Sequence, residues 1–212
     1  MNASVNKKTI FLTQFAMLLA IEAIVCFTPL GSLPIGPIVA TLSAVPVIIT
    51  AIMLGTRAGT AMGFFFGLFS FCVWTFTPPS PIIAFVFTPF YSVGALHGNF
   101  LSLVICFVPR ILIGTVTGLL FHLFTRLKWN KVLAYGLSGV LGSLVNTLLV
   151  LGGIYVFFGQ SYATVIGKSF NALLGIIGLS VLTGGVPEAI IGGIAAYAIC
   201  YPIQKHMNHN FE

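Results

Sequence analysis

Carboxylates are almost absent from this chain: its 212 residues include only three, Glu22, Glu188 and Glu212. Lysine and arginine add nine further charges, so 6% of the residues are charged, whereas soluble domains average about 25%. Hydrophobic residues make up 58% of the chain, against about 45–50% in soluble domains. So few charges cannot solvate the surface of a globule of this size. The sequence therefore excludes a soluble enzyme, a nucleic-acid-binding domain and a disordered tail, and it predicts an integral membrane protein.

Apolar segments of membrane-spanning length recur along the chain. A helix needs roughly 20 apolar residues to cross about 30 Å of hydrocarbon, and it satisfies its own backbone there. We expect an all-α bundle of six transmembrane helices, one membrane domain over residues 1–212. Five segments run from about Lys8 to Phe27, Ile38 to Leu54, Thr56 to Phe76, Phe100 to Phe124 and Val132 to Phe158.

The sixth segment ends near Tyr201, and its start is open. The sequence Gly184-Gly185-Val186-Pro187 would break an ordinary helix, and Pro187 suits a first helical turn. One reading is a single interrupted helix. The other is a short re-entrant piece followed by a final helix from Pro187 to Tyr201. We favour six full crossings.

Lysine and arginine gather on one side of the predicted membrane. With the N-terminus inside, the outer loops hold only Lys168, and the inner loops and ends hold Lys7, Lys8, Arg57, Arg126, Lys128, Lys131 and Lys205. The positive-inside rule then predicts cytoplasmic termini in a multi-pass protein of the cell membrane. The two longest connections, 77–99 and 159–171, fall outside. Long ordered loops tend to carry function, so we expect a ligand to meet the outer face first.

Arg110 is the clearest polar residue at membrane depth. It lies about ten residues into the fourth segment, near the midplane, where a charge costs roughly 2.5–3.5 kcal/mol on the insertion scale. Pro109 before it leaves a backbone carbonyl of the preceding turn free, which makes a local polar spot. Either Arg110 contacts a ligand, or it is a structural partner of Glu22 or Glu188.

Three other polar residues share the apolar segments. Asn146, in the middle of the fifth segment, suits either helix–helix hydrogen bonding or ligand contact. Glu188 follows Pro187 and suits the first turn of a helix, where the macrodipole favours an anion, or a ligand site. Glu22, toward the outer end of the first segment, favours snorkelling or pairing.

Small residues four apart allow helix backbones to approach closely. Gly59, Gly63 and Gly67 open the third segment, and we interpret them as packing inside the bundle. Ala16 and Ala20 in the first segment have the same spacing, which fits either internal packing or the interface with a partner protein.

Aromatic and loop residues carry weaker signals. Trp74 and Tyr91 lie near the expected outer boundary and are interpreted as interfacial belt residues. His97 and Asn99, in the long outer loop, are compatible with capping a pocket or with a solvated loop.

Motifs for a metal, a cofactor or catalysis are not evident. The four cysteines, Cys26, Cys72, Cys106 and Cys200, are isolated in apolar runs without a metal-ligand spacing, so we expect structural packing and no cofactor. Gly136-Leu137-Ser138-Gly139 matches the nucleophile motif of rhomboid-type intramembrane proteases. Such chemistry needs a base near Ser138, and His122 is the only candidate. We expect no enzyme and keep this protease, and a small channel or structural subunit, as alternatives.

Several stretches resemble one transporter family. Six short helices, cytoplasmic termini and Ala16-x-x-x-Ala20 are similar to the substrate-binding S component of energy-coupling factor (ECF) vitamin transporters. The stretches that sharpen this resemblance are Phe27-Thr-Pro-Leu-Gly31, Val45-Pro-Val-Ile-Ile49, Val108-Pro-Arg-Ile-Leu-Ile-Gly114, Asn146-Thr-Leu-Leu-Val150 and Gly185-Val-Pro-Glu188. They are most similar to the pantothenate-specific branch.

The resemblance implies a mechanism and residue roles. An S component captures a vitamin at its outer face and docks through its first helices onto a transmembrane coupling protein, which two cytosolic ATPases drive. Ala16 and Ala20 would contact the coupling protein, and Arg110, Asn146 and Glu188 would line the vitamin site. The chain departs from the family pattern at Leu42-Ser43-Ala44, where a His is expected, and at Gly184-Gly185, where Asn-Gly is commoner.

The chemistry of the three site residues is compatible with pantothenate, which has one carboxylate, an amide and two hydroxyls. A single Arg offers a bidentate match to one carboxylate, and Asn and Glu suit amide and hydroxyl groups. Folate, with two carboxylates and a pterin, would need more cations and an aromatic sandwich. Pyridoxine or a pyrimidine precursor, being neutral, would leave Arg110 without an obvious ligand partner.

Overall fold

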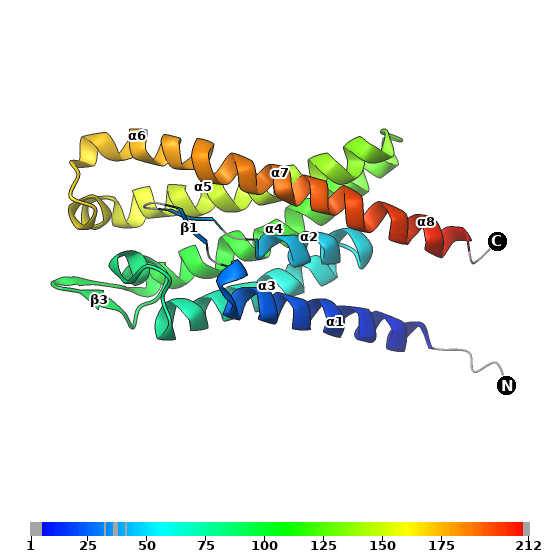
Figure 1. Cartoon of the computed structure of the whole chain (residues 1–212), viewed down its shortest axis with the longest axis horizontal. Helices are drawn as coiled ribbons and strands as arrows, with labels where there is room; N and C mark the ends of the chain where they lie inside the picture. The colour runs from blue at the N-terminus through cyan, green and yellow to red at the C-terminus, as the bar shows by residue number, and fades with distance from the viewer. Residues whose placement is uncertain (1–5, 32, 36–37, 41, 210–212) are drawn as a thin grey trace.

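The computed structural model describes residues 6–31, 33–35, 38–40 and 42–209, which form a bundle of long helices lying side by side (Figure 1). Five helices in this part of the chain are long and apolar enough to cross a membrane. They are α1 (Lys7–Phe27), α3 (Thr56–Phe76), α4 (Phe100–Arg126), α5 (Lys131–Val165) and the continuous run Phe170–His206. The prediction of an all-α integral membrane bundle is confirmed.

Shorter elements connect the long helices. Between α1 and α3 lie η1 (Pro29–Gly31), the antiparallel pair β1 (Leu33–Ile35) and β2 (Ile38–Ala40), and α2 (Ala44–Met53). Between α3 and α4 lie η2 (Pro81–Val86) and the antiparallel pair β3 (Ser92–Val93) and β4 (Leu96–His97). The connection 77–99 is therefore ordered structure rather than a bare loop.

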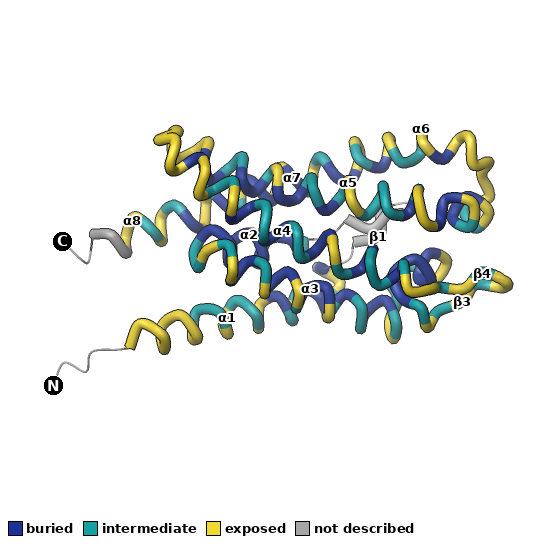
Figure 2. The backbone as a smooth tube through the Cα atoms, turned by 180° about the vertical axis from the view of Figure 1, so that it is seen from behind, coloured by how far each residue is buried: buried dark blue, intermediate teal, exposed yellow. Residues whose placement is uncertain are grey.

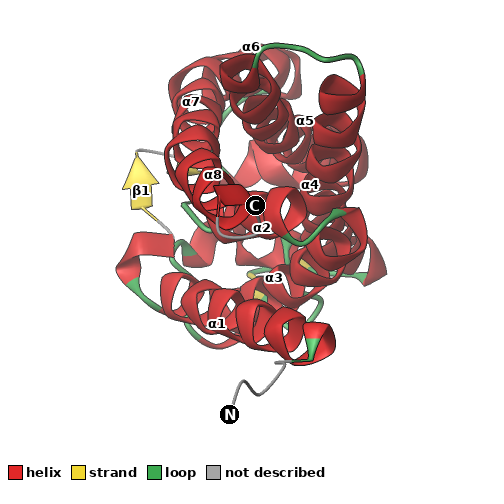
Figure 3. Ribbon diagram, turned by 90° about the vertical axis from the view of Figure 1, so that its right-hand side faces the viewer, coloured by secondary structure: helices red, strands yellow, loops and turns green. Residues whose placement is uncertain are grey.

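The second predicted segment, Ile38–Leu54, is too long. Its first residues form β2, and α2 has only 10 residues, which span about 15 Å at 1.5 Å per residue. Eight of those 10 residues are buried, so α2 is surrounded by other elements of the bundle. Figure 3 looks along the bundle from the end with both termini, and α2 lies in the middle of the long helices.

The sixth segment is one interrupted helix, so the alternative of a separate final helix from Pro187 is wrong. Helix α6 (Phe170–Ser180) continues through η3 (Val181–Gly185), α7 (Val186–Ala195), η4 (Ala196–Cys200) and α8 (Tyr201–His209). The segments η3 and η4 are π-helical. A wider π turn before Pro187 accommodates a residue that cannot donate a backbone hydrogen bond.

The fifth helix is longer than predicted. Helix α5 continues to Val165, so the outer loop expected over 159–171 shrinks to the residues between Val165 and Phe170. Both termini and the α2–α3 and α4–α5 junctions lie at one end of the bundle, and η2, the β3–β4 hairpin and the α5–α6 turn lie at the other (Figure 1).

Helices α3 and α4 meet through glycines. A Cβ on Gly63 would come 2.3 Å from the backbone oxygen of Arg110, and one on Gly114 would come 2.0 Å from that of Gly59. Such distances leave no room for any side chain. The interpretation of the glycine series as bundle packing is confirmed, and the α3–α4 contact fixes the backbone from which Arg110 projects.

Helix α1 lies on the outside of the bundle (Figure 2). Of its described side chains, only Glu22 and Cys26 are buried. Ala16 and Ala20 are exposed, so these two alanines do not pack inside the bundle.

Candidate functional site

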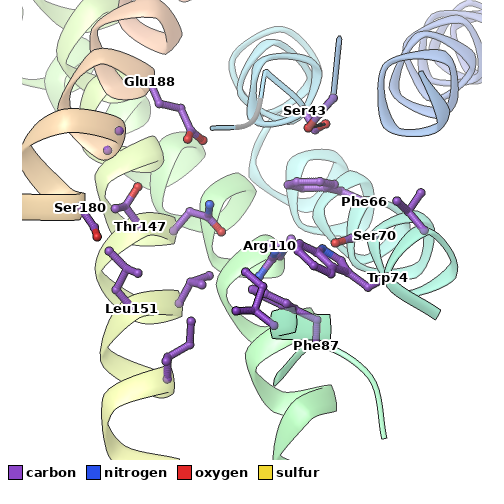
Figure 4. A pocket seen from close by; sticks show the side chains of 18 of the residues that line it. Ser43, Phe66, Ser70, Trp74, Phe87, Arg110, Thr147, Leu151, Ser180 and Glu188 are labelled. Atoms are coloured by element: carbon purple, nitrogen blue, oxygen red, sulfur yellow. Dashed lines mark hydrogen bonds between the residues drawn. The ribbon is translucent and has the colours of Figure 1, made fainter. Parts of the chain in front are cut away.

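A pocket lies inside the bundle between α3, α4, α5 and the last helix (Figure 4). All three residues assigned from sequence to a ligand site, Arg110, Asn146 and Glu188, line it. The other lining residues are Cys26, Gly31, Ser43, Phe66, Ser70, Val73, Trp74, Ile83, Phe87, Thr147, Val150, Leu151, Ile154, Tyr162, Ser180, Gly184 and Gly185. The walls are thus mostly apolar, with polar groups at separated points, as ligand pockets usually are.

Arg110 is held by its own helix. Pro109 has no N–H, so the carbonyl of Ile105, four residues earlier, lacks its usual helical donor. The Arg110 Nη1 donates a hydrogen bond of 2.8 Å to that carbonyl. The local polar spot expected from Pro109 is therefore present, and Arg110 itself occupies it.

Two aromatic rings flank the guanidinium. The Cζ atom of Arg110 lies 5.4 Å from the centre of the Phe87 ring and 5.7 Å from that of Phe66. Phe87 in turn stacks on Trp74, with ring centres 4.4 Å apart. Cation–π contacts of this kind stabilise a desolvated cation by about 2 kcal/mol. They also fix the plane in which the remaining N–H groups of Arg110 point.

Trp74 is not a belt residue. Its side chain is only 5% exposed and belongs to the pocket wall, so the interpretation from its position near the membrane boundary is wrong. Distance along a helix indicates depth in the membrane but not which way a side chain faces. The position of η2, which brings Phe87 against Trp74, could not be read from sequence.

Polar atoms at the pocket are left without protein partners. Among the described residues, the Nε of Arg110 and the Oδ1 of Asn146 are buried and have no hydrogen-bond partner. Buried polar atoms are nearly always satisfied, so orphaned ones beside a cavity indicate where a ligand or water would bind. Asn146 thus differs from an asparagine used only to join two helices.

Glu188 lies across the pocket from Arg110 (Figure 4). It occupies the first turn of α7, directly after the π-helical η3, as the proline before it predicted. Ser180, Gly184 and Gly185 of the same region also line the pocket. π-Helical turns are frequent at functional sites, and Gly184 and Gly185 of this turn line the cavity.

Small hydroxyl side chains around the pocket were missed from sequence. Ser43, Ser70, Thr147 and Ser180 line it, and they come from four different elements or junctions. Serine and threonine are common in membrane helices, so their identity alone gives no signal. Thr147 stands next to Asn146, and Ser43 lies in the stretch Leu42-Ser43-Ala44 where the chain departs from the family pattern, but neither was assigned to the site.

Glu22 is fully buried, so it does not snorkel to the membrane surface. Its Oε1 accepts a hydrogen bond of 3.2 Å from the Cys26 thiol, one helical turn later. Its Oε2 has no hydrogen-bond partner among the described residues. Glu22 is thus not the hydrogen-bonded partner of Arg110 that the sequence allowed.

Asn99 and His97 do not cap the pocket. The Asn99 side chain accepts a hydrogen bond of 2.8 Å from the backbone N–H of Leu101, and the Ser102 hydroxyl accepts one of 3.1 Å from that of Asn99. Asn99 is therefore the N-cap of α4. His97 is exposed in β4. The described residues contain no cluster of three or more histidines, cysteines and carboxylates that could hold a metal ion.

Comparison with known proteins decides the family. Residues 11–204 match the family model described as the substrate-specific component of ECF transporters. The Pantothenic acid transporter PanT of Lactococcus lactis subsp. cremoris is 37% identical over 82% of each chain. The chain is an ECF transporter S component. A second relative, the Pantothenate transporter PanT of Leuconostoc mesenteroides subsp. mesenteroides, is 29% identical over 89% of this chain and 93% of its own length.

The fold of this S component has a counterpart among solved structures. The crystal structure of the S component for biotin from an ECF-type ABC transporter aligns with a TM-score of 0.53. The alignment covers 93% of this chain and 94% of that one, at 16% sequence identity. At that identity the similarity concerns the fold alone.

The rhomboid-like motif of the S component is structural. Ser138 is fully buried, and its hydroxyl donates a hydrogen bond of 2.6 Å to the carbonyl of Ala134. Membership in a transporter family, together with this hydrogen bond inside one helix, argues against a serine nucleophile.

Proposed function

We propose that this S component captures pantothenate at the outer face of the cell membrane. We infer that it then delivers the vitamin inward with a transmembrane coupling protein and two ATPase subunits. Both relatives identified above are named for pantothenate transport. The single observation that carries the ligand assignment is one guanidinium, held between two rings, on the wall of a mostly apolar pocket.

The polar groups of the pocket suit the groups of pantothenate. Arg110 would bind the carboxylate, since its Nε has no partner in the described protein. Asn146 and Glu188 would bind the amide and hydroxyl groups, with the serine and threonine hydroxyls nearby. Among the described lining residues Arg110 is the one permanent cation, which favours a ligand with one carboxylate over folate. A neutral vitamin such as pyridoxine would give the guanidinium no carboxylate of the ligand to bind.

Ligand entry requires the pocket to widen. The cavity measures about 100 Å³, whereas pockets that hold drug-sized ligands measure roughly 300–1,000 Å³. The wall formed by Ile83 and Phe87 belongs to the short η2 region rather than to a long helix. We infer that this cap moves outward when pantothenate enters.

The orientation and crossing number follow from the same proposal. The basic junctions and both termini lie at one end of the bundle, which we assign to the cytoplasm, and η2 and the β3–β4 hairpin then face outward (Figure 1). Six crossings require α2, too short alone, to cross together with the β1–β2 region before it. The whole chain would then be a single membrane domain with cytoplasmic termini.

The decisive experiment compares pantothenate with pantothenol, in which a neutral alcohol replaces the carboxylate. Isothermal titration calorimetry of the purified protein should give at least about ten-fold tighter binding of pantothenate, since a hydrogen bond to a charged group is worth about 1.5–3 kcal/mol. Arg110→Gln should abolish this preference. Equal affinity of the native protein for both ligands, or an unchanged preference in the variant, would contradict the assignment of Arg110.

A further inference from the structure

A second cavity, of about 440 Å³, lies at the end of the bundle that carries both termini. It shares no lining residue with the pocket around Arg110. Its rim carries three exposed lysines, Lys128, Lys131 and Lys205, from the α4–α5 junction, the start of α5 and α8. Three cations on different elements converge here without any carboxylate in the described lining.

The floor of this cavity is rigid and amphipathic. The Tyr135 hydroxyl donates a hydrogen bond of 2.5 Å to Oε1 of Gln204, whose Nε2 donates one of 3.3 Å to the carbonyl of Ile52. Lys131 lies 5.9 Å above the ring of Tyr201. Tyr135 and Trp129 also line the cavity, so its walls combine aromatic rings with the three cations.

Lys128 has a backbone conformation that glycine would adopt more easily. It ends α4 with a φ of 54°, in the left-handed region. The N–H of Trp129 donates to the carbonyl of Phe124 at 3.1 Å, and that of Lys128 to the carbonyl of Thr125 at 3.1 Å. These two bonds form a Schellman motif, completed by stacking of the Phe124 and Trp129 rings 4.6 Å apart.

The opposite end of the bundle offers a direct comparison. Helix α5 ends in the same motif, with Lys168 donating to Ala163 at 2.9 Å and Gly167 to Thr164 at 3.1 Å. There the left-handed position is Gly167, with φ 67°. At the end of α4 a lysine thus occupies a strained left-handed position that glycine would adopt without strain. We infer that the ammonium group of Lys128 has a function other than stabilising the fold.

We propose that this cavity binds the phosphate head group of an anionic membrane lipid. The three lysines and the N-terminal end of α5 attract the phosphate, and Trp129 suits the glycerol level of the bilayer. Leu127, Val132 and Leu133 do not line the cavity but are next in sequence to residues that do, and they are exposed apolar side chains along which acyl chains can lie. This apolar continuation favours a lipid over free phosphate. The bound lipid fixes the depth of this end of the bundle in its leaflet.

Native mass spectrometry of the detergent-solubilised protein, titrated with phosphatidylglycerol and with phosphatidylcholine, tests the proposal. Phosphatidylglycerol should bind several-fold tighter. Lys131→Gln and Lys205→Gln should each weaken its binding about five-fold, the effect of about 1 kcal/mol for a lysine near a membrane surface. Lys8→Gln, the same change at the same end but outside the cavity, should leave binding unchanged.

Lys128→Gly separates lipid binding from folding. It should weaken phosphatidylglycerol binding while raising the midpoint of thermal unfolding, because glycine relieves the left-handed strain. Three results would overturn the proposal: equal binding of the two lipids, equal losses in Lys8→Gln and Lys131→Gln, or displacement of the lipid by inorganic phosphate at equal concentration. The last would indicate a site for free phosphate.

Discussion

The Nη1 of Arg110 donates a 2.8 Å hydrogen bond to the carbonyl of Ile105, the acceptor that Pro109 leaves without a helical donor. The proline and the arginine thus act together. The proline makes an acceptor available in the low-dielectric interior, and the arginine uses it to hold its side chain along its own helix. The guanidinium therefore faces the pocket in one orientation before any ligand arrives.

Pro109→Ala should separate binding from stability. The alanine N–H would donate to the Ile105 carbonyl and compete with Arg110 for it, so the helix gains a bond while the guanidinium loses its anchor. We expect thermal stability equal to or above that of the native protein and pantothenate affinity lower by about ten-fold, or about 1.4 kcal/mol. Calorimetry and thermal unfolding measure the two quantities. Pro202→Ala in α8, away from the pocket, is the control. An equal loss of pantothenate affinity in Pro202→Ala would contradict the role assigned to Pro109 in anchoring Arg110.

Trp74 should report ligand binding by its fluorescence. The chain has two tryptophans, Trp74 in the pocket around Arg110 and Trp129 at the other cavity. Pantothenate contacts or reorders the aromatic wall, so its addition should change the emission of Trp74. The change should persist in Trp129→Phe and disappear in Trp74→Phe, with binding followed independently by calorimetry. A signal that depends on Trp129 would exclude the pocket as the ligand site.

The sequence predicted the third helix and the polar spot beside Arg110 for local reasons. Thr56–Phe76 is bounded by Gly55, with φ 95°, and by the prolines after Thr77, so both ends are set by nearby residues. The polar spot at Arg110 required only the rule that a proline frees the carbonyl four residues earlier. Such relationships are contained within one or two helical turns.

The incorrect predictions concern segments whose structure depends on elements distant in the sequence. The stretch Ile38–Leu54 is apolar throughout, and such a stretch has the same pattern whether it forms a strand and a buried short helix or one spanning helix. Trp74 faces inward and stacks on Phe87, which directly follows η2. At η3, Gly185 lies so close to Thr147 of α5 that an added Cβ would come 2.5 Å from the Thr147 methyl group. None of these contacts is visible in a local pattern.

Gly63→Ala should destabilise the bundle. Its Cβ would meet the Arg110 carbonyl oxygen at 2.3 Å, so α3 and α4 must separate, at a cost of about 1–3 kcal/mol. That shift also moves the backbone of Arg110, and pantothenate affinity should fall with stability. Gly152→Ala in α5 is the matched control, because nothing lies within 4 Å of its added Cβ. Since alanine has a higher helix propensity than glycine, thermal unfolding in detergent should show no loss for it. Comparable losses in the two variants would contradict the explanation by α3–α4 packing.

Enlarging the exposed small residues of α1 should uncouple binding from transport. Ala16 and Ala20 are exposed on the least buried of the five long helices, so leucine there should leave the fold and the pocket intact. If this face contacts the coupling protein, the larger side chains prevent close approach of the two helices. Ala16→Leu and Ala20→Leu should therefore keep pantothenate affinity within about two-fold while abolishing ATP-dependent uptake and co-purification with the coupling complex. Ala198→Leu, an exposed alanine of the last helix, should affect neither; uptake that survives in both α1 variants would show that the partner docks elsewhere.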